Sequence, residues 1–268
     1  MIDFPNAKIN LGLNVVEKRA DGFHNIETVF YPIQWKDALE IIPSDQFDLE
    51  IKGIEVEGDM ESNLITKAYR ALEIDHQLEP VKAILLKNIP MGGGLGGGSS
   101  DAAFMFKLIN QFNALNLTIK QMEDYVRPLG SDCAVFIKNA PTYAFGKGDE
   151  FEEINIDLSG YKIVTVNPHI HVGTATAYQY LTPKRPEQNI KSMLQLPVEE
   201  WKGKLENDFE ESVFKQFPEI EKLKQDLYSK GAIYASMSGS GASVYGIFTP
   251  SIAIDFKEAY PKYAVNES

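Results

Sequence analysis

The chain opens with a segment in which apolar and polar side chains alternate. Within residues 8–15, every second residue is apolar: Ile9, Leu11, Leu13 and Val15. A period of two predicts a β-strand that lays its apolar face on a core. Lys8 and Asn10 share the opposite face, which, taken alone, is most simply a solvated face of the strand. Asp21-Gly22 then indicates a turn into a returning strand.

A second pattern, in the middle of the chain, predicts a strand, a glycine loop and a helix in that order. Residues 81–89 mix apolar and polar side chains over the length of one strand and end at Pro90. After the loop, apolar residues recur at spacings of up to five: Ala103, Phe104, Leu108, Ile109 and Phe112. This spacing is typical of a helix that packs on a core, and Ser99 or Ser100 is the expected N-cap.

The rest of the chain continues this mixture of helices and strands. A capping box at Thr118–Gln121 starts a helix that should end near Pro128 and Gly130. A strand is expected over 161–166, amphipathic helices over 198–230, and two strands within 232–248. We therefore expect an α+β fold. The order of the motifs places a domain boundary near residue 155, giving domains 1–155 and 156–268.

The glycine loop is the strongest chemical signal in the chain. It reads Pro90, Met91, Gly92, Gly93, Gly94, Leu95, Gly96, Gly97, Gly98, Ser99 and Ser100. Glycines have no Cβ, so consecutive N–H groups can turn toward one anion, and the N-terminus of the following helix adds its free donors. The loop therefore predicts a phosphate site, and with it nucleotide binding.

Two common phosphate loops fit this stretch poorly. The Walker A loop ends in Gly-Lys-Ser/Thr, whereas this loop ends in Gly-Ser-Ser without a lysine. The dinucleotide-binding pattern G-x-G-x-x-G is matched by Gly92, Gly94 and Gly97, but any run this rich in glycine can match it by chance. The acidic residue expected about 20 positions later is also missing, since 116–118 read Asn-Leu-Thr.

Composition limits the remaining classes of function. With 268 residues, 44% of them hydrophobic, the chain can form one large or two modest cores. A net charge of −12 argues against nucleic acid as a partner. No run of 18 apolar residues and no signal-like start is present, and a lone cysteine suits a reducing cytoplasm. A polyanionic ligand then needs a local basic pocket or a cation, for which Mg²⁺ is the natural candidate. Nothing in the sequence indicates an oligomeric state.

Taken together, the motifs resemble the GHMP kinase superfamily. The stretch Pro90–Ala103 is similar to its glycine-rich motif, and the other matching segments follow in the right order along the chain. They are Ala7–Leu13, Lys18–His24, Thr28–Phe30, Leu129–Asp132 and Ser238–Ala242. The N-terminal segments narrow the resemblance to the branch that phosphorylates a small cytidine-diphosphate substrate in non-mevalonate isoprenoid biosynthesis.

The resemblance implies a two-domain GHMP kinase fold. Its N-terminal domain is similar to domain 2 of ribosomal protein S5, and its C-terminal domain is ferredoxin-like. It also implies ATP as co-substrate, with the glycine loop around the ATP phosphates and the turn at Ser238–Gly241 nearby. Locally, that turn is most simply a tight connection between two strands.

The same resemblance assigns roles to individual residues. Asp132 would take the proton of the substrate hydroxyl, as a full base or as an orienting group, and Lys8 would keep Asp132 ionised. From local sequence alone, Asp132 is equally well a helix cap. Asn10 would help to place the substrate, and His24 would hydrogen-bond the cytosine. The base would stack on Phe23, with Tyr178 of the segment that begins at Thr174 on its other face.

A few residues depart from the family pattern or allow a simpler interpretation. Asp101 replaces a common asparagine, and either helps to hold magnesium or points outward. Phe23 replaces a common tyrosine and keeps only the stacking face. Cys133 is expected to be a small core residue. His169 and His171 are interpreted as structural, because two histidines without a third ligand are a weak metal signal. The rival functions are homoserine or mevalonate phosphorylation and catalytically silent nucleotide binding.

Overall fold

The computed structural model describes residues 1–268, which form two compact units, each built from three stretches of the chain. Unit 1 comprises residues 1–7, 35–91 and 96–140, and unit 2 comprises 8–34, 92–95 and 141–268. Helices and sheets are mixed in each unit, as the α+β expectation requires. The domain boundary near residue 155 stays a prediction.

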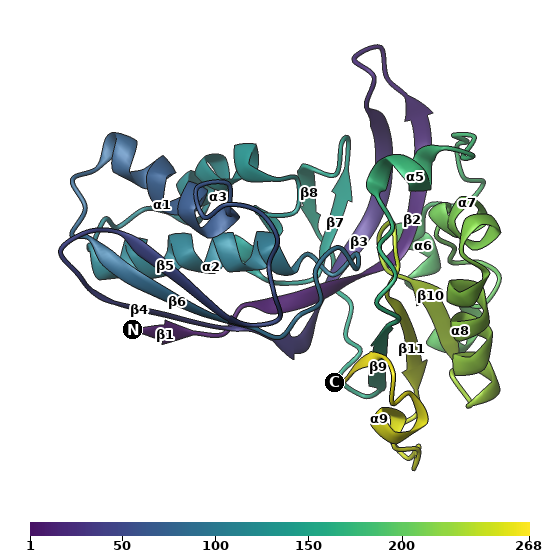
Figure 1. The fold of residues 1–268 in the computed structure, drawn as a ribbon. Helices are drawn as coiled ribbons and strands as arrows, with labels where there is room; N and C mark the ends of the chain where they lie inside the picture. The colour runs from purple at the N-terminus through teal and green to yellow at the C-terminus, as the bar shows by residue number, and fades with distance from the viewer. The chain divides into compact units, whose positions relative to one another are not determined.

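Unit 1 is a four-stranded sheet with helices over one face (Figure 1). The strand order is β1-β4-β6-β5, with β5 and β6 parallel and the other neighbours antiparallel. Its strands are β1 (Ile2–Asp3), β4 (Ala38–Pro43), β5 (Asp48–Gly53) and β6 (Val81–Lys87). Its helices are α1 (Leu64–Asp75), α2 (Gly97–Phe112), α3 (Ile119–Val126), the 3₁₀ turn η1 (Arg127–Leu129) and α4 (Val135–Lys138). The expected strand, glycine loop and helix are thus β6, 90–96 and α2.

The start of α2 differs from the expected serine cap. The helix begins at Gly97, its N-cap is Gly96 in the left-handed conformation with φ +69°, and no side chain caps it. The backbone N–H of Ser100 already donates to Gly96 O at 2.9 Å, so Ser100 lies inside the first turn. The prediction of Ser99 or Ser100 as N-cap is therefore wrong. By contrast, the capping box of Thr118 and Gln121 at the start of α3 is confirmed.

Unit 2 holds two further sheets of four strands. The first has the order β2-β3-β7-β8, and the second, β10-β11-β9-β12, is antiparallel throughout. The strands are β2 (Asn6–Lys18), β3 (His24–Lys36), β7 (Thr142–Phe145), β8 (Glu150–Glu153), β9 (Lys162–Asn167), β10 (Tyr234–Met237), β11 (Val244–Phe248) and β12 (Ala264–Glu267). The helices are α5 (Thr174–Tyr178), α6 (Ile190–Met193), η2 (Val198–Glu200), α7 (Phe209–Gln216), α8 (Pro218–Ser229) and α9 (Phe256–Ala259).

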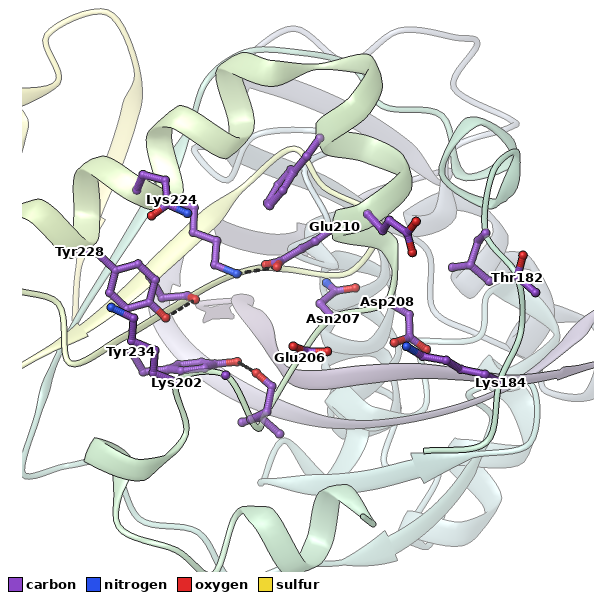
Figure 2. Close-up of a pocket in the computed structure, with 17 residues that line it drawn as sticks. Thr182, Lys184, Lys202, Glu206, Asn207, Asp208, Glu210, Lys224, Tyr228 and Tyr234 are labelled. Atoms are coloured by element: carbon purple, nitrogen blue, oxygen red, sulfur yellow. Dashed lines mark hydrogen bonds and ion pairs between the residues drawn. The ribbon is translucent and has the colours of Figure 1, made fainter. Parts of the chain in front are cut away.

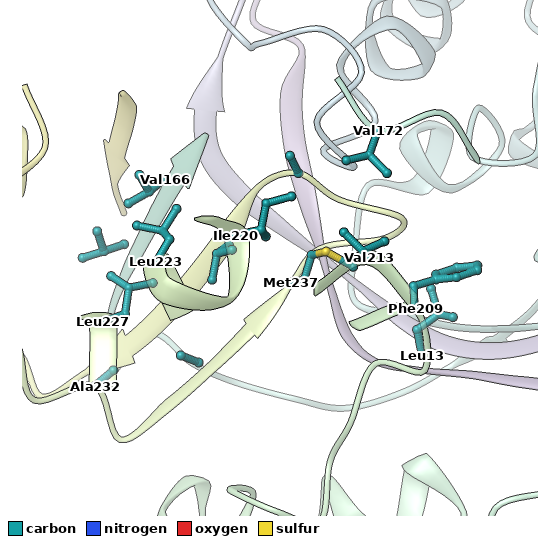
Figure 3. Close-up of a cluster of buried hydrophobic side chains, with 14 of the residues drawn as sticks. Leu13, Val166, Val172, Phe209, Val213, Ile220, Leu223, Leu227, Ala232 and Met237 are labelled. Atoms are coloured by element: carbon teal, nitrogen blue, oxygen red, sulfur yellow. The ribbon is translucent and has the colours of Figure 1, made fainter. Parts of the chain in front are cut away.

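The core of unit 2 lies where α7 and α8 cover the second sheet (Figure 3). α8 begins well because Pro218 occupies its first turn together with Glu219 and Glu221, which favour the positive end of the helix dipole. Its apolar stripe of Ile220, Leu223 and Leu227 packs on Val166 of β9 and on Met237 of β10, among others. Leu13 and Val15 bring β2 into the same cluster.

The polar face of β2 is buried too. Lys8 is 3% exposed and Asn10 2%, so the interpretation of this face as solvated is wrong. The side chains of Lys8 and Asn10 are hydrogen-bonded, as most buried polar groups are. None of the helices is long and apolar enough to cross a lipid bilayer.

Candidate active site

In unit 2, Lys8 of β2 reaches the middle of the glycine loop. Its Nζ donates to Gly94 O at 3.0 Å and to Asn10 Oδ1 at 2.7 Å. The ammonium also lies 4.9 Å from the centre of the Phe30 ring, a cation–π distance. Asn10 is held in turn because its Nδ2 donates to Thr28 Oγ1 at 2.9 Å. The buried lysine and asparagine are therefore fixed in orientation beside the loop.

The turn after β10 meets the same loop carbonyl. Ser238 Oγ donates to Gly94 O at 2.8 Å, and the backbone N–H of Ser243 donates to Gly93 O at 3.2 Å. Gly94 has φ +74°, and a Cβ there would lie 2.0 Å from Ser238 O, so only glycine fits. Three motifs that are far apart in the sequence thus meet at Gly94.

Two further residues belong to this neighbourhood, and the sequence placed neither of them there. A Cβ on Gly93 would lie 2.4 Å from Asn167 Nδ2, which donates to Ser243 Oγ at 2.9 Å. A Cβ on Gly92 would lie 3.1 Å from His171 Nδ1. Asn167 is the last residue of β9 and carried no signal in the sequence, whereas His171 lies in the segment after β9 and was interpreted only as structural.

The two ends of the glycine loop belong to unit 1. Pro90 is buried and Met91 is 46% exposed, while Gly96 to Ser100 form the entry into α2. A 16-residue helix leaves its first N–H groups without intrahelical acceptors and places its positive dipole end at the loop. The start of α2 can thus supply several backbone donors to an anion.

Asp132 also lies in unit 1, in the turn between η1 and α4. The helix before it ends at Val126 and η1 at Leu129, close to the predicted end at Pro128 and Gly130. Asp132 is half-buried, and Ser131 Oγ donates to its Oδ1 at 3.2 Å. The neighbouring Cys133 is fully buried, and burial raises the pKa of its thiol to about 11, so it is an inert core residue, as expected.

The aromatic residues predicted to bind a base lie in unit 2 around the start of β3. His24 stacks on Tyr178 of α5, with ring centres 4.4 Å apart and planes within 17°. Tyr178 in turn meets the edge of Phe209 at 4.8 Å, and Thr174 begins the same short helix. Burial lowers the pKa of His24, which favours the neutral imidazole.

Phe23 stands apart from this stack. Its side chain is 60% exposed at the hairpin turn and lies 5.3 Å from Lys147 Nζ. The aromatic pair that the structure brings together is thus His24 and Tyr178.

Asp101 does not point outward, and that alternative is wrong. It is 3% exposed on α2, and its Oδ2 accepts from Lys87 Nζ at 2.7 Å. No three histidine, cysteine, aspartate or glutamate side chains come close enough together to hold a metal ion. The chain therefore offers no cage of its own for magnesium, which commonly binds through one or two carboxylates plus substrate phosphates.

A separate pocket of about 590 Å³ opens in unit 2 between α7, α8 and the segment before α7 (Figure 2). None of the predicted site residues lines it. Two of its charged groups form an ion pair, since Lys224 Nζ lies 2.5 Å from Glu210 Oε2, and Glu210 Oε1 also accepts from the Met237 N–H at 2.8 Å. Because no predicted site residue lines it, this pocket is not the site that the motifs indicate.

Comparison with known proteins agrees with the motifs. Residues 63–140 match the family described as GHMP kinases N terminal domain, and residues 190–266 match GHMP kinases C terminal. A relative from Bacteroides fragilis, named 4-diphosphocytidyl-2-C-methyl-D-erythritol kinase, is 52% identical over 267 residues and 97% of each chain. One of the same name from Bacteroides thetaiotaomicron is 53% identical over 93% of each chain.

A solved structure gives the same result for the fold. The crystal structure of a 4-(cytidine 5'-diphospho)-2C-methyl-D-erythritol kinase superposes with a TM-score of 0.85 at 28% identity, covering 100% of this chain and 98% of the other. This likeness bears out the expected two-domain architecture. The chain belongs to the GHMP kinase family.

Proposed function

We propose that the chain transfers the γ-phosphoryl group of ATP to the 2-hydroxyl of 4-diphosphocytidyl-2-C-methyl-D-erythritol, giving the 2-phosphate and ADP. The observation that carries the proposal is the meeting of Lys8, Gly94 and Ser238, which sets a buried ammonium beside the middle of the glycine loop. The names of the full-length relatives supply the substrate. The reaction belongs to non-mevalonate isoprenoid biosynthesis, for which we propose a cytoplasmic location.

Phosphoryl transfer asks the protein mainly for positioning and charge stabilisation. In this proposal the backbone amides of residues 90–100 surround the ATP phosphates, and Lys8 offsets the negative charge of the transferring group. Asp132 orients the substrate hydroxyl and accepts its proton. Magnesium bound together with ATP would neutralise part of the phosphate charge.

The cytidine end of the substrate is assigned to the aromatic residues of unit 2. His24 in its neutral form can hydrogen-bond a base, and Tyr178 and Phe23 offer flat faces for stacking. Asn10 and Thr174 complete the proposed substrate contacts. The stacked arrangement of His24 on Tyr178 supports a site for a flat ring at this position.

A coupled assay for ADP release tests the proposal. The purified protein is given ATP and Mg²⁺ with the cytidine substrate, homoserine, mevalonate or galactose in parallel. We expect turnover with the cytidine compound alone. Turnover of homoserine or mevalonate in its place would refute the substrate assignment, and ATP binding without turnover of any acceptor would favour a silent nucleotide-binding protein.

A further inference from the structure

A single buried ammonium in unit 1 holds two carboxylates. Lys87, the last residue of β6, pairs with Asp37 just before β4 and with Asp101 in the first turns of α2, the latter at 2.7 Å. The side chains of Lys87 and Asp37 are fully buried, and that of Asp101 is 4% exposed. None of the three can touch a ligand directly, so any effect on a reaction acts through the backbone.

The three residues connect the two ends of the glycine loop. Asp37 Oδ1 accepts from the backbone N–H groups of Asn88 at 2.5 Å and Ile89 at 2.8 Å, the residues that lead into Pro90. Asp101 lies where the chain leaves the loop and enters α2. Lys87 therefore joins the entry and the exit of the loop through one charged group.

The packing around the ammonium leaves little room for adjustment. A Cβ on Gly97, the first residue of α2, would lie 3.0 Å from Lys87 Nζ and 2.9 Å from Ile89 Cγ2. The lysine side chain thus lies directly against the first helical turn. A shift of Lys87 would move the backbone donors at the start of α2.

Stability alone does not account for this cluster. Removing charges from water costs about as much as the ion pairs return, and apolar replacements of similar volume are often neutral or stabilising. Here two carboxyl groups share one ammonium, and Asp101 Oδ1 is buried without a hydrogen-bond partner. What a charged, directional cluster offers over an apolar one is a fixed geometry between the segments that it joins.

We propose that Lys87, with Asp37 and Asp101, is a positioning residue that sets the spacing between the two ends of the glycine loop and thereby determines the affinity for the ATP phosphates. The inference rests on the proposed function, in which this loop surrounds ATP. It assigns the cluster to the nucleotide and not to the cytidine substrate, whose proposed contacts lie in unit 2.

The test measures ATP binding by isothermal titration calorimetry and the two KM values by the ADP assay. Lys87→Met removes the charge and keeps nearly the same side-chain length, but it leaves two buried carboxyl groups without their ammonium partner. The double variant Lys87→Met/Asp101→Asn also removes one of these carboxyl groups. Lys82→Met is the matched control, because Lys82 lies on the same strand but pairs with Glu50 at a partly exposed position, at 2.7 Å. Asp101→Asn alone keeps an oxygen to accept from Lys87.

We expect both Lys87 variants to raise the dissociation constant and the KM for ATP at least tenfold, with the KM for the cytidine substrate changed less than twofold. Lys82→Met should leave all three constants unchanged. Asp101→Asn should raise the two ATP constants less than either Lys87 variant does, because the amide oxygen still accepts from Lys87. A purely structural role would instead lower the fraction of folded protein, which reduces the titrated stoichiometry and leaves the dissociation constant intact.

The inference is overturned if the double variant is folded and binds ATP as tightly as wild type, or if both KM values rise together. The two proposals fail in distinguishable ways. If the wild-type protein binds ATP but phosphorylates another acceptor, the proposed substrate is wrong. The inference about Lys87 is then still tested by the ATP dissociation constants of its variants. Wild-type protein that binds no ATP would overturn both.

Discussion

At the scale of single residues, Asp132 carries the most specific expectation. Asp132→Asn keeps the shape of the side chain but removes its basicity, so we expect turnover to fall by roughly 10²–10⁴-fold, the usual contribution of a general base. ATP affinity, measured by calorimetry, should stay within about twofold of wild type. The control is Asp157→Asn, because the side chain of Asp157 accepts a hydrogen bond from the Ser159 N–H within its own turn. A wild-type rate in Asp132→Asn would exclude the residue as proton acceptor.

His24 tests the assignment of the base. His24→Ala removes the hydrogen bond proposed between His24 and the cytosine, together with the ring stacked on Tyr178. Leaving a buried polar group without its partner costs about 1–3 kcal/mol, so the KM for the cytidine substrate should rise about 5- to 150-fold with little change in kcat. Phe23→Ala, made in parallel, separates the exposed phenylalanine from the stacked pair, and His76→Ala in unit 1 serves as control. An unchanged KM in His24→Ala would remove this residue from the substrate site.

Gly94 should tolerate no side chain. Gly94→Ala places a Cβ 2.0 Å from Ser238 O and forces alanine to φ +74°. The left-handed conformation alone costs about 1–2 kcal/mol, and the collision adds to it. Urea unfolding should report a loss larger than that figure, together with weaker ATP binding. Gly160→Ala, where no atom lies within 4 Å, should match wild type.

Several residues of the candidate site could be singled out from the sequence because short motifs carry them, and their proposed roles stay predictions. Lys8, Asn10 and the glycine loop belong to this group. The partnership of Lys87 with Asp37 and Asp101 could not be read, because the two aspartates lie 50 and 14 residues from the lysine. The positions of Asn167 beside Gly93 and of His171 beside Gly92 could not be predicted for the same reason, since only the fold brings these residues together.

At the scale of elements, the start of α2 should respond to pH. Burial raises the pKa of Asp101 to about 7, with Asp37 adding to the rise and Lys87 opposing it. The unfolded chain has an ordinary pKa of about 3.9 at this position. The folded protein therefore binds more protons in between, and this residue's contribution to stability is lost as pH rises from about 4 to about 7.

Asp101→Asn provides the test, because asparagine does not titrate. The free energy of unfolding is measured in urea at several pH values for both proteins. The variant should gain stability relative to wild type as pH rises through this window, and the difference should level off above it. A constant difference across the window would contradict the raised pKa.

The core under α8 makes a separate prediction about stability. Leu227 is fully buried in the cluster of unit 2, so Leu227→Ala should cost about 2–5 kcal/mol through lost burial and the cavity that remains. Ile74→Ala, at a side chain 82% exposed on α1, should cost little. Equal losses in the two variants, measured by chemical unfolding, would show that α8 does not carry the core.

The sequence predicted helices and strands well where a short local pattern, such as a capping box or a turn between two apolar runs, determines where they begin or end. The capping box at Thr118, the strands 234–237 and 244–248 around the Ser238 turn, and the strand before the glycine loop all formed as expected. The start of α2 was predicted too late in the chain. Serine is a preferred N-cap residue, which favoured Ser99 or Ser100, whereas the structure has Gly96 as N-cap in the left-handed conformation. The burial of the polar face of β2 could not be read from the pattern, because apolar and polar residues alternate in the same way in a strand whose polar face is exposed to solvent.

At the scale of the whole molecule, the sequence led to the family because its motifs keep their order along the chain. The matched family regions, 63–140 and 190–266, agree with that order. The sequence did not predict that each compact unit is built from three separate stretches of the chain. The domain boundary near residue 155 was placed from the order of the motifs, which carries no information about contacts between distant segments. Contacts such as Tyr245 Oη donating to Asn10 O at 2.8 Å instead assign an early strand to the later unit.

The interleaved path has a practical consequence for engineering. Each compact unit draws on three separate stretches, so no single crossover point between this chain and a relative would exchange one unit whole. A chimera meant to transplant unit 2 must carry 8–34, 92–95 and 141–268 together. Recombination at one site would instead yield hybrids in which partner strands come from different parents, and such libraries should contain few well-folded members.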